Sequence, residues 1–136
     1  MSSTNETLIR DFYAAVSRGA TGDELAAFFD PDARQIEYPS RLRPAGHTRG
    51  LDEILAGAEL GLSVITDQSY ELHAFLEQGD RAAAQFTWRG TLAVDAGGIP
   101  AGTRLVAHVG AFYEFRGSRI LSQASYDCYE PIASRG

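Results

Sequence analysis

The chain has 136 residues, of which 44% are apolar and 22% charged, so it predicts one folded, soluble domain over 1–136 and excludes disordered and collagen-like classes. All 12 basic residues are arginines, and without lysine the protein cannot form a Schiff base or hold pyridoxal phosphate through one. The net charge of −6 and the lack of a basic stripe argue against nucleic acid as a partner.

Two further features bear on the compartment. Cys128 is the only cysteine, so the chain forms no internal disulfide. No run approaches the roughly 18 apolar residues that a membrane helix needs, and the polar segment 1–6 is not typical of a signal peptide. We therefore expect no membrane association and a cytoplasmic location.

The first half of the chain predicts mainly helices. Apolar residues recur at three- and four-residue spacing from Leu8 to Val16, and Gly19 supplies a stop. Proline disfavours a helical conformation in the residue before it, so the second helix should end before Pro31. The elements expected here are a helix over about 6–18, a helix starting near 21–23, a short strand over 33–38, a positively charged loop over 39–50 and a helix over about 51–62.

The second half predicts β-structure. Four alternating or apolar runs are separated by turn-forming residues, so we expect long antiparallel strands in one strongly twisted sheet whose single covered face carries the helices. The runs are 68–77, 81–94, 103–116 and 119–129.

This α+β order resembles the cone-shaped domain of the nuclear transport factor 2-like superfamily, in which three N-terminal helices pack on a strongly curved antiparallel sheet. The segments that carry the resemblance are FYAAVSRGATGDELAAFFDPDARQIEYP, GLDEILAG and GIPAGTRLVAHVGAFYEFRGSRILSQASYDCY. They look most like SnoaL-like polyketide cyclases and ketosteroid isomerases. Such motifs specify the fold well and the reaction poorly, because one fold hosts many activities.

Strand alternation indicates which side chains can reach a pocket. In run 103–116 the apolar set includes Tyr113, whereas His108 points the other way. In run 81–94, Phe86 and Trp88 share a face. The aromatic side chains that we expect to shape a pocket are Trp88, Phe86, Tyr113 and Phe112.

The last strand holds the strongest catalytic candidate. Apolarity does not decide its inner face, so Asp127 could face either the pocket or solvent. The resemblance implies that Gln123, Ser125 and Asp127 face the pocket. An inward carboxylate among tyrosines would have a raised pKa and could act as a general acid or base.

Two tyrosines are candidate hydroxyl donors. Tyr13 lies on the first expected helix, where it is either a core residue or a donor to an oxyanion, and the resemblance matches it to the oxyanion-hole Tyr of ketosteroid isomerases. At the position of their catalytic base this chain has Tyr38, with Glu37 beside it on the opposite parity, and at the position of their second Asp it has Ala111. A steroid isomerase is therefore not expected, and Tyr38 becomes a donor or an aromatic wall.

The loop 39–50 brings a positive charge to the expected mouth of the cone. His47 and the arginines Arg41, Arg43 and Arg49 are either solvated or serve to hold an anionic or carbonyl-rich substrate, with His47 as a candidate catalytic helper. The three histidines lack metal-ligand spacing, so neither a metal nor a cofactor is expected.

Together these features predict a cofactor-independent cyclase or isomerase that acts on a small apolar, oxygenated metabolite by proton transfer. The alternatives are an epoxide hydrolase or dehydratase on the same fold, or a binding module without turnover. An epoxide hydrolase would need two acids beside an arginine, and alternation does not assemble an Asp-Arg-Asp set. The outer sheet face, with Val106, His108 and Phe112, is apolar enough to predict a homodimer.

Overall fold

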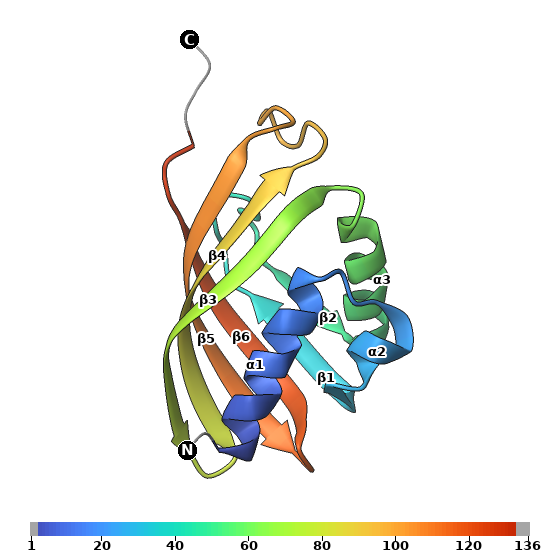
Figure 1. Ribbon diagram of the computed structural model, residues 1–136, viewed down its shortest axis with the longest axis vertical. Coiled ribbons are helices and arrows are strands. Elements are labelled where there is room, and N and C mark those ends of the chain that lie inside the picture. Colours follow the sequence, from blue (N-terminus) through green and yellow to red (C-terminus); the bar gives the residue numbers. More distant parts are fainter. Residues whose placement is uncertain (1–2, 133–136) are drawn as a thin grey trace.

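The computed structural model describes residues 3–132, which form three helices and a six-stranded sheet (Figure 1). The helices lie on one side of the curved sheet, so the predicted α+β architecture is confirmed. In chain order the elements are α1 (Thr4–Ser17), α2 (Gly22–Ala26), β1 (Phe29–Glu37), β2 (His47–Gly50), α3 (Leu51–Gly61), β3 (Ile65–Gln78), β4 (Arg81–Leu92), β5 (Arg104–Arg116) and β6 (Arg119–Tyr129).

The sheet order is β2-β1-β6-β5-β4-β3. The four long strands β3 to β6 pair antiparallel with their neighbours in sequence, as predicted. The pairing of β1 with β6 is parallel, with Glu37 opposite Ser125, and it joins two segments that are far apart in the sequence. This pairing brings the polar residues of β1 beside those of β6.

The helices cover the sheet through apolar side chains. The Oγ of Ser3 caps α1 by accepting a hydrogen bond from the backbone N–H of Glu6 at 3.0 Å, so the helix begins two residues before the predicted start. Gly19 follows its end with a φ of 85°, a conformation that glycine adopts readily. Ile9 and Phe12 of α1 are buried against the sheet.

Two boundaries differ from the sequence-based expectation. The strand β1 begins at Phe29 and not at 33, so the second helix is shorter than predicted. Pro31 lies within the strand, where the register with β6 shifts between Phe29 and Arg34; such an irregular position tolerates a residue without an N–H. The end of the predicted loop 39–50 forms β2, which pairs antiparallel with β1.

The face of the sheet away from the helices carries a group of exposed aromatic side chains. The rings of Tyr38 and Tyr126 are stacked with centroids 4.5 Å apart, and Phe112 meets Tyr126 edge-on at 6.0 Å. We call Tyr38, Phe112 and Tyr126 the outer aromatic cluster. None of the helices within 3–132 is long and apolar enough to cross a membrane.

Candidate functional site

The candidate site is a cavity of about 630 Å3 between the sheet and the helices. All three helices and all six strands contribute to its lining, with Arg49 as the contribution of β2. Loop residues at 41–44, 96–97 and 99 complete it. The volume lies in the range typical of small-molecule sites.

One part of the lining is apolar. Phe86 and Trp88 of β4 line it as predicted, and Leu92 and Ile99 extend this surface. The indole N–H of Trp88 donates to Oε1 of Gln68 at 3.0 Å, which fixes the orientation of the ring. Such a wall suits a flat apolar ligand.

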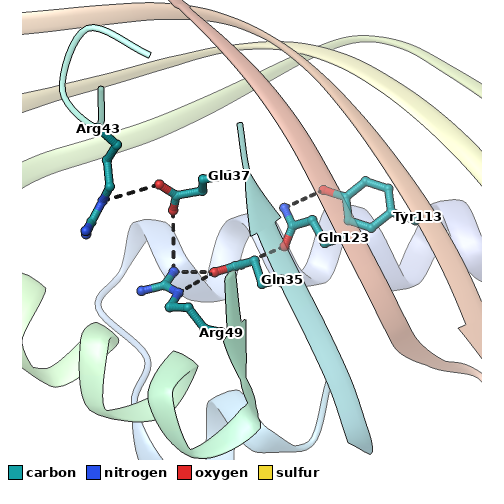
Figure 2. Close-up of polar contacts among 6 residues, drawn as sticks. All are labelled: Gln35, Glu37, Arg43, Arg49, Tyr113 and Gln123. Atoms are coloured by element: carbon teal, nitrogen blue, oxygen red, sulfur yellow. Dashed lines mark hydrogen bonds and ion pairs between the residues drawn. The ribbon is translucent and has the colours of Figure 1, made fainter. Parts of the chain in front are cut away.

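Another part of the lining is polar and lies across the neighbouring strands β2, β1 and β6 (Figure 2). Arg49 of β2 donates from Nε to Oε1 of Gln35 at 2.9 Å and makes a second hydrogen bond to the same oxygen from Nη2. Glu37 lies 3.5 Å from Nη2 of Arg49 and 3.5 Å from Nε of Arg43. Burial lowers the pKa of Arg49 and Glu37 opposes this effect, but an arginine stays charged at neutral pH.

A chain of hydrogen bonds runs from this polar wall into the core. Gln35 Nε2 donates to Gln123 Oε1 at 2.8 Å, and Gln123 Nε2 donates to the hydroxyl of Tyr113 at 3.1 Å (Figure 2). The hydroxyls of Tyr113 and Tyr13 are 2.6 Å apart and share a hydrogen bond. In both Gln35 and Gln123 the amide oxygen and the amide nitrogen are hydrogen-bonded, so this chain of hydrogen bonds fixes the side chain of Gln35 that Arg49 contacts.

Asp127 lines the cavity, together with Gln123 and Ser125 of the same strand face. Burial raises the pKa of Asp127, and the negative charge of Glu37 raises it further, whereas a hydrogen bond from Ser125 partly opposes the shift. The carboxyl therefore holds its proton to a higher pH than an ordinary aspartate does.

Two tyrosines that the sequence analysis did not select also line the cavity. Burial raises the pKa of both Tyr70 and Tyr129, and the charge of Asp127 adds to the shift, so both hydroxyls stay protonated. Neither hydroxyl has a hydrogen-bond partner among residues 3–132, and both remain available as donors. Tyr129 shares the strand parity of Asp127, a signal that could have found it.

The structure does not bring every predicted site residue to the cavity. Gln35 and Glu37 face the cavity, so the next residue on the strand, Tyr38, points to the outer face and is 39% exposed. The same alternation places Phe112 outside, 54% exposed. The expectation that these two aromatic residues form the pocket is wrong.

Three other predicted residues lie near the cavity without lining it. Tyr13 and Tyr113 are buried in the core, where their hydroxyls are bonded to each other. His47 pairs with Glu37 across the β1–β2 ladder, and its Nδ1 is buried with no hydrogen-bond partner among the residues described. Within 3–132 no three His, Cys, Asp or Glu side chains are grouped so that they could hold a metal ion.

Comparison with known proteins identifies the family. The model of the SnoaL-like domain matches residues 9–123, most of the chain. The protein belongs to the SnoaL-like domain family. A search of curated proteins finds no match.

Solved structures agree with the fold of this SnoaL-like protein. IdmH of Streptomyces antibioticus is 20% identical, with a TM-score of 0.74 and 92% of each chain covered. A SnoaL-like polyketide cyclase from Agrobacterium tumefaciens is 21% identical, with a TM-score of 0.69 over 93% of this chain and 92% of that one. A protein with a ketosteroid isomerase-like fold from Catenulispora acidiphila is 18% identical, with a TM-score of 0.70 over 88% of this chain and 83% of that one. At these identities the likeness establishes the fold.

Proposed function

We propose that this SnoaL-like protein is a cofactor-independent cyclase or isomerase that acts on a flat, apolar, oxygenated metabolite of polyketide type. The observation that carries the proposal is the position of Asp127, a partly buried carboxyl with a raised pKa in the wall of a largely apolar cavity. Membership of the SnoaL-like domain family and the likeness to a SnoaL-like polyketide cyclase support it.

The chemistry needs one group that moves a proton and one that stabilises an oxyanion. The Asp127 carboxylate removes a proton from a carbon next to a substrate carbonyl, and the electron pair of that C–H bond forms an enolate. The hydroxyls of Tyr70 and Tyr129 donate hydrogen bonds to the enolate oxygen. In a cyclisation the enolate carbon then attacks a second carbonyl of the same molecule, and Asp127 returns its proton to the new alkoxide. In an isomerisation the proton returns to another carbon.

The test is product analysis with candidate polyketide intermediates. Asp127→Asn keeps the size of the side chain but cannot accept the proton, so turnover should fall by at least about a hundredfold, in line with the usual contribution of a general base. Tyr38→Phe, on the outer face, serves as the control with wild-type turnover. Unchanged turnover in Asp127→Asn would remove this residue from the mechanism.

A second candidate, the hydrolysis of an epoxide, is favoured by one feature that the sequence analysis could not assemble. Two carboxylates, Glu37 and Asp127, line the same cavity as Arg49. One carboxylate could activate water while the other, protonated, opens the epoxide ring. The sequence did not reveal this set because the resemblance matched Tyr38, and not Glu37, to the pocket.

Reaction in water enriched in oxygen-18 separates the two candidates. Epoxide hydrolysis puts one labelled oxygen into the product diol, whereas cyclisation and isomerisation form no bond to water oxygen. A binding module without turnover would bind such compounds in the cavity and leave every substrate unchanged.

A further inference from the structure

The distribution of charge sets the cavity apart from the rest of the molecule. The chain carries a net charge of −6. The ionisable side chains in the cavity lining, other than tyrosines, are three arginines and two carboxylates, namely Arg41, Arg43, Arg49, Glu37 and Asp127. A cavity of this kind attracts anions although the whole protein repels them.

Arg49 is the most buried of the three arginines that line the cavity. Its side chain is 16% exposed, compared with 49% for Arg43. Its Nε and Nη2 atoms contact Gln35 and Glu37, but Nη1 makes no hydrogen bond with any residue that the structure describes. A guanidinium has five N–H donors, and those on Nη1 are left for a ligand.

Glu37 does not neutralise this charge fully. It lies 3.5 Å from Arg49 and 3.5 Å from Arg43, so one carboxylate is shared by two arginines. Arg116 shows what a close structural pair looks like in the same protein, because it donates to both carboxylate oxygens of Asp30 at 2.6 and 3.0 Å. The contact between Arg49 and Glu37 is longer than such charge-assisted hydrogen bonds, which measure about 2.7–2.9 Å.

The absence of a side chain at Gly57 leaves room for the guanidinium of Arg49. Gly57 lies inside α3 and lines the cavity, and a Cβ added there would come within 2.6 Å of Arg49 Nη1. A glycine in a helix interior is less favourable than alanine by roughly 0.5–1 kcal/mol. The space that Gly57 leaves beside Arg49 Nη1 explains why a glycine stands at this helical position.

We propose that the ligand of this cavity carries a carboxylate, which Arg49 binds through its free Nη1 amino group, and that Gly57 is a positioning residue for this contact. The inference rests on the proposed function only in placing the substrate in this cavity. It concerns binding, so it is tested without turnover, whereas the role of Asp127 is tested by turnover.

A matched acid and ester provide the test. Anthraquinone-2-carboxylate and its methyl ester share a flat, oxygenated ring system and differ in charge. Trp88, the only tryptophan, lines the cavity, so quenching of its fluorescence reports binding there. In the wild type we expect the acid to bind at least about tenfold more tightly than the ester, in line with one hydrogen bond to a charged group.

Two variants test the assignment by different routes. Arg49→Gln should remove the preference for the acid and leave the affinity for the ester within about threefold. Gly57→Ala keeps the arginine but displaces Nη1, so the preference should fall while the free energy of unfolding does not decrease. Arg89→Gln is the control, because Arg89 pairs with Glu71 and does not line the cavity.

Three results would overturn the proposal. The first is equal affinity of the wild type for acid and ester. The second is a preference for the acid that survives in Arg49→Gln. The third is loss of both probes in Arg49→Gln together with a full preference for the acid in Gly57→Ala, which would assign Arg49 to the stability of the fold.

Discussion

The paired hydroxyls of Tyr13 and Tyr113 allow a stability prediction from the contacts. Tyr113 is 2% exposed, and its hydroxyl oxygen contacts both Gln123 Nε2 and the hydroxyl of Tyr13. Tyr113→Phe therefore leaves two polar groups without a partner in the core. At about 1–3 kcal/mol for each of the two unsatisfied buried groups, we expect the free energy of unfolding to fall by about 2–6 kcal/mol.

Tyr13→Phe is the matched variant. It removes a hydroxyl with one partner, and Tyr113 still accepts the hydrogen bond from Gln123. The expected loss is about 1 kcal/mol, near the net value of one hydrogen bond. In the double variant the two losses should not add, because both substitutions remove the same hydrogen bond.

The assay is equilibrium unfolding in urea, monitored by the fluorescence of Trp88. The slope of the free energy against urea should stay unchanged, which shows that the midpoint reports stability. If Tyr113→Phe costs no more than Tyr13→Phe, the buried chain of hydrogen bonds does not contribute as its geometry implies. If Tyr13→Phe lowers turnover at unchanged stability, the tyrosine has a role in the reaction and its assignment to the core fails.

Three further predictions concern charge and assembly. Because burial raises the pKa of Asp127, folding disfavours the charged form of this side chain. Asp127→Asn should therefore increase the free energy of unfolding in urea at pH 7, and this gain should vanish below the ordinary pKa of 3.8. An equal gain at pH 7 and below pH 3.8 would contradict this reasoning. Arg116 lowers the pKa of Asp30, so Arg116→Gln should lower the melting temperature at pH 7 but have little effect in acid, where Asp30 is protonated in both variants. We propose that the protein forms a homodimer through the outer aromatic cluster. Phe112→Asp should sediment as a monomer, whereas the control Leu60→Asp, an exposed position on α3, should remain a dimer. A wild-type protein that sediments as a monomer at micromolar concentration would refute the proposal.

Local pattern predicted the larger part of the fold. Helical spacing and strand alternation are set by residues close in sequence, which is why α3 and the strands β4, β5 and β6 lie within two residues of the expected bounds. The pairing of β1 with β6 was not predictable in the same way, because it depends on contacts between residues about ninety positions apart, such as Glu37 and Ser125. The strand β2 was missed because HTRG has no alternation and gains its hydrogen bonds from β1.

The candidate site was predicted in part. Strand alternation found Phe86 and Trp88, and the family resemblance placed Asp127 on the cavity face, where the structure has it. Glu37 was missed because the resemblance matched Tyr38 to the position of the catalytic base, and in a strand a shift of one residue moves a side chain to the opposite face. Arg49 was recognised as a charged residue of a loop, but its burial depends on the space beside Gly57.

The parallel contact of β1 with β6 also bears on how the protein is made. The strands β3 to β6 form successive hairpins, whereas β1 leaves the ribosome before all of them and pairs with β6, which follows the other three in chain order. Long-range pairing of this kind is slow because the intervening chain must first lose entropy. The wall that holds Gln35 and Gln123 together is therefore expected to close last, so that a truncated chain without β6 has hairpins but no binding chamber.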